Sequence, residues 1–253
     1  MKKRLDVLLV ERGLAESRAQ AQALVMAGRV PGFEKAGQQV DEEAPLELTQ
    51  PARFVSRGGE KLDHALDVLR VDPEGRRCLD VGASTGGFTD VLLQRGAAEV
   101  IALDVGRAQL HERLREDARV TVMESVNARH LAELPFAPEL VTCDVSFISL
   151  RQVLPAVLRL ADPGWEAVVL VKPQFEAGRE HVKGGVVRSP EVHRDVLKGT
   201  ADAALAWDAA TVGVADSGLP GPKGNREFFL HLVNRANPEL SPELDDWIRD
   251  AVG

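Results

Sequence analysis

Tyrosine is absent from the 253-residue sequence, and aromatic residues make up only 4% of it. Few flat side chains are therefore available on which a nucleic-acid base could stack. Cations are outnumbered as well, since 31 Lys and Arg stand against 39 Asp and Glu, for a formal net charge of -8. A surface that binds phosphates throughout would be basic, so any nucleic-acid contact must come from a local basic patch.

Cysteine is scarce too. Cys78 and Cys143 lie in apolar runs, which predicts buried thiols in a reducing cytosol. The six histidines are scattered and no Cys/His ligand spacing occurs, so we expect no metal. Acidic and basic residues interrupt the stretch that follows the basic N-terminal residues, so no secretory signal is expected. No apolar run reaches about 18 residues, the length that a membrane-spanning helix needs. A globular, cytoplasmic protein without a membrane partner is therefore expected.

The hydrophobic pattern changes near residue 52. Before it, Ser17 is a candidate N-cap and Gly28 a helix end, which is typical of a small helical unit. Helices are predicted at 5–10 and 18–27, with short strands at 29–30, 39–40 and 46–48. These elements indicate a compact α+β unit of two helices and a small sheet.

After residue 52, apolar strands alternate with helices, which predicts an α/β, Rossmann-like parallel sheet covered on both faces. Strands are predicted at 77–81, 100–104, 120–123, 140–144, 167–171, 211–215 and 227–233. Helices are predicted at 60–69, 88–95, 109–115, 153–160 and 190–205. A long polar loop is expected at 173–189, and the last two strands are expected to form a hairpin-like pair at the sheet edge.

A glycine-rich turn follows the first of these strands and precedes a helix, as in a nucleotide-cofactor cradle. The dinucleotide pattern G-x-G-x-x-G would need glycine where Ser84 stands. A pyrophosphate therefore fits less well than a ligand without phosphate, such as S-adenosylmethionine. The predicted cofactor-binding residues of the turn are Asp80, Gly82, Ala83, Ser84, Thr85, Gly86, Gly87 and Phe88.

Polar side chains stand at the ends of the following strands, where open α/β sheets bind ligands. Asp104, followed by Val105, is placed to bond the ribose hydroxyls of a cofactor, and Asn127 its adenine edge. Asp144, which is also a predicted cofactor-binding residue, and Lys172 end neighbouring strands, so their charged groups are expected to meet. Pro173 would hold the chain extended after Lys172, and a structural ion pair is the alternative explanation.

Long motifs at 56–62, 80–88, 144–150, 171–176 and 219–229 resemble the TlyA family of ribosomal RNA ribose 2′-O-methyltransferases, also known as haemolysins. The resemblance covers essentially the whole chain. It implies an S4-like RNA-binding domain at 1–52, a linker at 53–56 and an FtsJ-like S-adenosylmethionine-dependent methyltransferase domain at 57–253. The catalytic tetrad that it implies is Lys61, Asp144, Lys172 and Glu227.

The roles of the tetrad follow from the reaction that the resemblance implies. A free lysine has a pKa of about 10.4 and is almost wholly charged at neutral pH. Lys172 is therefore expected either to accept the ribose proton or to orient the 2′-oxygen as a cation. The two carboxylates would hold it, and Lys61 would steady the developing oxyanion or a phosphate.

The implied partner is ribosomal RNA within a ribosomal subunit, with a monomer favoured. An extruded base could stack on Phe88, Phe147 or Phe175. The candidate RNA-binding residues are Lys3, Arg4, Arg18, Arg29, Arg57, Arg179, Lys183 and Arg188. The last three lie in the long polar loop.

Two other functions are considered. A nucleotide-dependent oxidoreductase could use a similar sheet, although Ser84 counts against it and binding of NAD rather than S-adenosylmethionine would reveal it. A membrane-active haemolysin, or an RNA-binding module without catalysis, would lyse cells or bind RNA independently of Lys172. The modified nucleotide and the choice of ribosomal subunit are not specified by the sequence.

Overall fold

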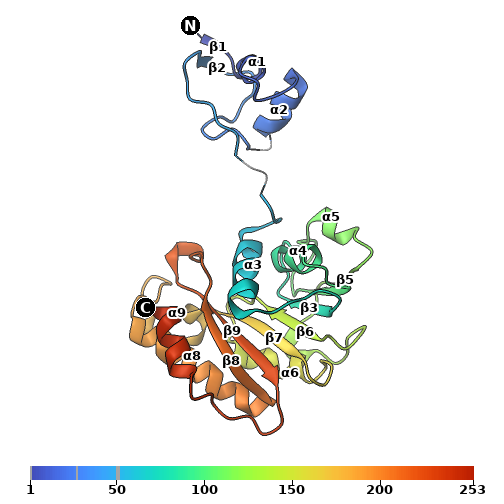
Figure 1. Ribbon diagram of the computed structural model, residues 1–253, viewed down its shortest axis with the longest axis vertical. Coiled ribbons are helices and arrows are strands. Elements are labelled where there is room, and N and C mark those ends of the chain that lie inside the picture. Colours follow the sequence, from blue (N-terminus) through green and yellow to red (C-terminus); the bar gives the residue numbers. More distant parts are fainter. Residues whose placement is uncertain (1, 27, 50–51) are drawn as a thin grey trace. The chain divides into compact units, whose positions relative to one another are not determined.

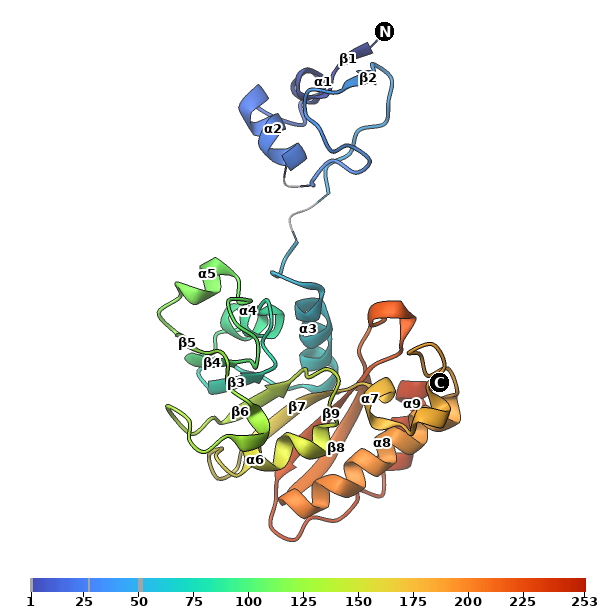
Figure 2. The ribbon, with the colours of Figure 1, turned by 180° about the vertical axis from the view of Figure 1, so that it is seen from behind.

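The computed structural model describes residues 2–26, 28–49 and 52–253 (Figures 1 and 2). The chain forms two compact units, Met1–Arg53 and Phe54–Gly253. Each has its own hydrophobic core.

The smaller unit packs two helices, α1 (Leu5–Glu11) and α2 (Arg18–Met26), over a core that includes Leu9 and Val25. Strands β1 (Lys2–Arg4) and β2 (Gln39–Asp41) pair antiparallel beside them. Both predicted helices are confirmed, apart from residue 27, which lies outside the described residues.

Two strand predictions in this unit were wrong. Residues 29–30 and 46–48 form no strand, and the backbone hydrogen bond near them runs from the amide of Thr49, just after the second segment, to the Arg29 carbonyl at 2.9 Å. Pro31 follows directly, and proline cannot donate to a strand ladder. Strand β1 was missed because its sequence, Lys-Lys-Arg, has no apolar residue.

In residues 54–253, all of which the structure describes, seven strands form one sheet in the order β5-β4-β3-β6-β7-β9-β8. Strands β3 to β7 are parallel, and β9 is antiparallel to both β7 and β8, which confirms the predicted edge pair. The strands are β3 (Arg77–Val81), β4 (Glu99–Leu103), β5 (Val120–Met123), β6 (Leu140–Cys143), β7 (Glu166–Val171), β8 (Ala209–Asp216) and β9 (Phe228–Asn234).

Helices cover both faces of the sheet (Figures 1 and 2). Because the side chains along each strand alternate between the two faces, the sheet contributes to a separate core on each side. Leu79 and Val81 face the core to which α6, α8 and α9 contribute, while Cys78 faces that of α3, α4 and α5. The α-helices are α3 (Arg57–Leu69), α4 (Gly87–Gln94), α5 (Glu112–Arg115), α6 (Leu154–Leu158), α7 (Pro173–Glu176), α8 (Pro190–Ala204) and α9 (Leu244–Val252). Short 3₁₀ turns are η1 (Ala128–His130), η2 (Leu150–Gln152), η3 (Arg179–His181), η4 (Leu205–Trp207) and η5 (Pro222–Gly224).

Two of these helices depart from the prediction. The segment expected to be a loop at 173–189 begins with α7, which starts at Pro173, and also contains η3. Proline is well tolerated in the first turn of a helix, so Pro173 does not keep the chain extended. Helix α9 was missed because its sequence is rich in Asp. Leu244, Ile248 and Val252 nevertheless form a buried apolar stripe on it.

Both cysteines are buried and free, as the sequence predicts. Burial raises the pKa of the Cys78 thiol to about 12 and also raises that of Cys143. Because the thiolate is the reactive form, we expect no alkylation of the folded protein by iodoacetamide at pH 8 within an hour and complete alkylation in urea, read by mass spectrometry. Rapid labelling of the folded chain would contradict this burial.

No helix in the described part of the chain combines the length and apolar character needed to cross a bilayer.

Candidate active site

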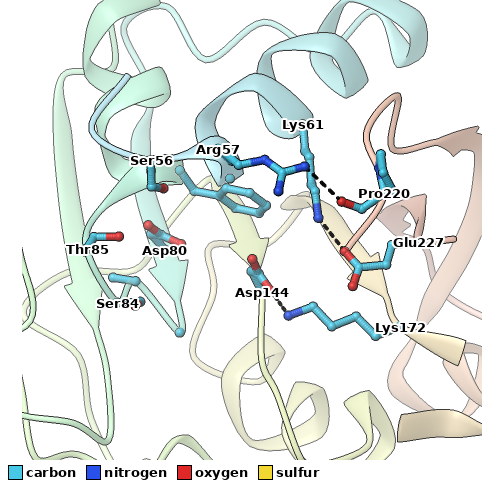
Figure 3. Close-up of a pocket in the computed structure, with 15 residues that line it drawn as sticks. Ser56, Arg57, Lys61, Asp80, Ser84, Thr85, Asp144, Lys172, Pro220 and Glu227 are labelled. Carbon is cyan, nitrogen blue, oxygen red and sulfur yellow. Dashed lines mark hydrogen bonds and ion pairs between the residues drawn. The ribbon is translucent and has the colours of Figure 1, made fainter. Parts of the chain in front are cut away.

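Two cavities adjoin at the carboxyl ends of the parallel strands. The first has a volume of about 380 Å³ and lies among the glycine turn, the start of α3 and the segment before β9 (Figure 3). The second has a volume of about 480 Å³ and extends over the ends of β4 and β5. Both are lined by Gly82, Ser84 and Asp144, so a ligand could extend from one cavity into the other.

The glycine turn brings backbone close to these cavities. Gly82 has φ +83°, and a Cβ there would lie 2.4 Å from the carbonyl oxygen of Asp144, so no side chain fits. Gly86 lines neither cavity, because its Cα faces Leu110 and Leu114. The other predicted turn residues, Asp80, Gly82, Ala83, Ser84, Thr85, Gly87 and Phe88, all line the first cavity.

The predicted nucleoside contacts line the second cavity. The Asp104 carboxylate accepts the Ser84 amide at 2.8 Å and the Gly106 amide at 2.6 Å, which fixes its orientation at the end of β4. Val105 is 72% exposed beside it. The Asn127 side chain accepts the Arg129 amide at 3.0 Å, so its amide group is held at the cavity edge.

The four tetrad side chains come together in the first cavity as two ion pairs (Figure 3). Lys61 Nζ on α3 lies 2.5 Å from Glu227 Oε2, and both side chains are buried. Lys172, after β7, pairs with Asp144 Oδ1, after β6, as predicted for neighbouring strands. The tetrad residues are separated by up to 166 positions in the sequence, and the cation of each pair is matched to one acid.

Two further side chains at the site were missed by sequence reasoning. Ser146 Oγ accepts a hydrogen bond of 2.9 Å from Lys172 Nζ, and Gln174 Nε2 donates to Glu227 Oε1 at 3.3 Å. Both residues lie within the motifs at 144–150 and 171–176. The sequence signal that could have identified them as site residues is the polar side chain that each contributes to its motif.

The comparisons with known proteins agree with this geometry. A model of the FtsJ-like methyltransferase family matches residues 54–234, and one of the S4 domain matches 3–30. The Mycobacterium tuberculosis (strain ATCC 25618 / H37Rv) protein named 16S/23S rRNA (cytidine-2'-O)-methyltransferase TlyA is 46% identical over 259 residues, covering 98% of this chain and 97% of its own. The chain belongs to the TlyA family.

Other relatives share this family resemblance. A Bacillus subtilis (strain 168) protein named as an rRNA methyltransferase, YqxC, is 49% identical over 240 residues, covering 91% of this chain and 85% of its own. A solved structure named as a hemolysin from Streptococcus thermophilus has a TM-score of 0.77 and 41% identity, covering 99% of this chain and 95% of its own. The predicted family, α/β fold and methyltransferase class are confirmed, and the oxidoreductase alternative is wrong.

In this TlyA-family chain, the predicted basic residues of the smaller unit contact acidic or carbonyl oxygens. Lys3 pairs with Glu11 and Glu42, while Arg4 and Arg18 share the buried carboxylate of Asp6. The Arg4 hydrogen bonds hold the pKa of Asp6 well below its usual range. Arg29 Nε donates to the Thr49 carbonyl. These contacts orient the basic groups but also offset part of their charge.

The candidates in the larger unit are placed differently. Arg57 lines the first cavity and donates to the Pro220 carbonyl at 3.2 Å. The other three, Arg179, Lys183 and Arg188, are exposed in the segment between α7 and α8.

The three candidate stacking rings differ in exposure. Phe88 is only 3% exposed and packs against Phe229, with ring centroids 5.9 Å apart, so it cannot receive a base. Phe147 is 91% exposed and has φ +64°, an uncommon conformation for a bulky residue. Its ring lies 5.1 Å from that of Phe175. Phe147 is therefore the open platform beside the second cavity.

Asp80 gives a pH-dependence prediction. Its carboxylate is fully buried, and it accepts the Thr89 amide at 2.9 Å and the Thr89 hydroxyl at 2.7 Å. Burial raises the pKa of Asp80 to about 7, so the folded state binds a proton that the unfolded chain loses near pH 4. The contribution of Asp80 to stability is therefore complete below about pH 4 and is lost as pH rises to about 7.

Substituting Asp80→Asn removes this titration. Between pH 5 and pH 8, urea unfolding of the wild type should show a larger fall in the free energy of unfolding than unfolding of the variant. Equal falls in the two proteins would mean that Asp80 keeps an ordinary pKa.

Proposed function

We propose that this protein transfers a methyl group from S-adenosylmethionine to the 2′-oxygen of a cytidine ribose in ribosomal RNA, within a ribosomal subunit. The observation that carries the proposal is the meeting of both ion pairs, Lys61–Glu227 and Lys172–Asp144, in a cavity that continues into the nucleoside site. The name of the Mycobacterium tuberculosis relative supports the substrate, because that protein is a cytidine-2'-O-methyltransferase.

The chain's residues fit S-adenosylmethionine. Gly82 keeps the backbone open where a Cβ would collide with Asp144, and the two adjoining cavities offer room for a nucleoside and for its methionine part. Asp104 and Asn127 would hold the ribose and the adenine. When bound, S-adenosylmethionine supplies a methyl group on sulfonium sulfur that is already activated for transfer.

The chain's own residues then handle the ribose hydroxyl. Lys172, held by Asp144 and Ser146, either accepts the proton of the 2′-hydroxyl or donates a hydrogen bond that orients the oxygen lone pair. Lys61, held by Glu227, stabilises the negative charge that develops on the oxygen. All four groups come from one chain, so we expect a monomer to be sufficient.

RNA recognition is assigned to both units. We assign 1–52 as the S4-like domain, 53–56 as the linker and 57–253 as the catalytic domain. The Arg4 and Arg18 guanidiniums, oriented by Asp6, would contact phosphates and set the register without reading bases. Phe147 would stack on the extruded target base. Since ribosomal subunits are the proposed substrate, we expect the protein to act in the cytoplasm.

The test uses the purified protein, S-adenosylmethionine with a labelled methyl group, and isolated small and large ribosomal subunits that lack the modification. Label should enter RNA of at least one subunit, and a reverse-transcription stop at low nucleotide concentration should map to a cytidine in each labelled RNA. Titration with S-adenosylmethionine and with NAD should give heat only for the former. The proposal would be overturned if neither subunit accepts a methyl group. It would also be overturned by lysis of erythrocytes that persists in a Lys172→Ala variant.

A further inference from the structure

The chain turns sharply after Lys172. The Phe175 amide donates to the Lys172 carbonyl, and the Ala177 amide to the Pro173 carbonyl, each at 2.9 Å, which closes the single turn of α7. Gln174 and Glu176 lie two residues apart on this turn, and side chains at that spacing point in different directions. Gln174 contacts the tetrad directly, whereas Glu176 contacts the loop that follows Asp144.

Gln174 reaches the Lys61–Glu227 pair. Its Nε2 donates to Glu227 Oε1 at 3.3 Å, while Lys61 holds Oε2 at 2.5 Å, so both oxygens of the carboxylate are fixed. The segment before β9 packs closely against this carboxylate, since a Cβ on Gly221 would lie 2.1 Å from Glu227 Oε1. Gln174 Oε1 is buried and accepts no hydrogen bond from the described residues. A buried polar atom without a partner costs stability. We therefore attribute the role of Gln174 to the hydrogen bond that its Nε2 donates to Glu227.

Glu176 reaches the loop that carries Asp144, the acid of the other pair. Its Oε1 accepts the Leu150 amide at 2.7 Å, and its Oε2 accepts the Ser149 hydroxyl at 2.6 Å. That loop begins at Asp144 and includes Ser146, the two residues that hold the Lys172 ammonium. Because both side-chain oxygens of Glu176 accept hydrogen bonds from this loop, Glu176 fixes the loop relative to the chain segment that carries Lys172.

We propose that Gln174 and Glu176 are positioning residues: through the turn of α7, Gln174 holds Glu227 and Glu176 holds the Asp144 loop in place relative to Lys172. The effect on catalysis rests on the proposed function, whereas the effect on the geometry of the lysines does not. Loss of either side chain should let one ion pair move. A shift of about an ångström at a reacting group is enough to lower the rate about a hundredfold.

The geometry is tested without turnover, by trace acetylation of the full-length protein with acetic anhydride and mass spectrometry. We expect Glu176→Ala to raise the acetylation rate of Lys172 at least about threefold, and Gln174→Ala to do so for Lys61, with exposed Lys35 as an internal reference. Glu176→Gln should restore the wild-type rate, because an amide can still accept from the Leu150 amide and bond the Ser149 hydroxyl. Unchanged labelling of Lys172 and Lys61 in the two alanine variants would overturn the inference.

Turnover supplies the second measurement. In Gln174→Ala and Glu176→Ala, kcat for methyl transfer to ribosomal subunits should fall about 10- to 100-fold, with KM for the subunits and the affinity for S-adenosylmethionine within about threefold of wild type. Glu176→Gln should recover most of the rate, and Glu116→Ala, an exposed glutamate on the surface, should be unaffected. A raised KM with unchanged kcat, or no rescue by glutamine, contradicts a positioning role. If the wild type transfers no methyl group, the proposed function fails and the acetylation result alone decides this inference.

Discussion

Substituting Lys172→Ala is expected to lower kcat for methyl transfer at least about a thousandfold, which is the scale set by removal of a proton-transfer or oxyanion-stabilising group. The substitution removes the side chain that pairs with Asp144 and donates to Ser146, which is the group proposed to take the ribose proton or to orient the oxygen. Affinity for S-adenosylmethionine, measured by isothermal titration, should stay within about threefold, because the nucleoside contacts lie in the second cavity. A variant that keeps more than a tenth of wild-type turnover would contradict this role.

Lys172→Arg separates the two chemical roles. A guanidinium is always charged and can orient an oxygen lone pair, but it cannot accept a proton. If Lys172 is the general base, the arginine variant should be as inactive as the alanine variant. If Lys172 orients the hydroxyl as a cation, arginine should recover at least about tenfold of the lost rate in the same single-turnover assay.

The tetrad could be predicted in part because parallel strands end at one edge of the sheet. Asp144 and Lys172 end neighbouring strands β6 and β7, so their pairing followed from strand order. The pairing of Lys61 with Glu227 did not follow. Lys61 lies on α3, and Glu227 precedes a strand that runs antiparallel between β7 and β8, so their approach depends on how α3 packs on the sheet. The family resemblance supplied that part of the set.

Local structure around the site was harder to predict where one residue type allows two conformations. Pro173 suits an extended chain as well as the first turn of a helix, and the backbone hydrogen bonds from the Phe175 and Ala177 amides show that the chain takes the helical turn. The type of a residue also does not reveal which residue it will contact. Arg4 and Arg18 could be named as basic candidates, but Asp6 between them in the sequence gave no sign that it would hold both.

Substituting Glu227→Ala should cost stability as well as activity. The Glu227 side chain is wholly buried and that of Lys61 is 9% exposed, so the variant would leave a buried ammonium without its acid. Breaking such a pair from one side costs about 3–5 kcal/mol. For a unit of this size that corresponds to a fall in Tm on the order of 10 °C, read by differential scanning calorimetry. A Tm within about 2 °C of wild type would mean that Lys61 finds water or another partner.

The double variant Glu227→Leu with Lys61→Met separates stability from catalysis. Replacing both members of a buried ion pair by apolar side chains of similar volume is often neutral or stabilising, because neither charge then has to leave water. We therefore expect the double variant to recover most of the lost Tm while methyl transfer remains at least about a hundredfold below wild type. Recovery of turnover together with stability would show that the pair only holds α3 against β9. Stability without turnover would leave a chemical role as the reason that two charges are kept in the core of the site.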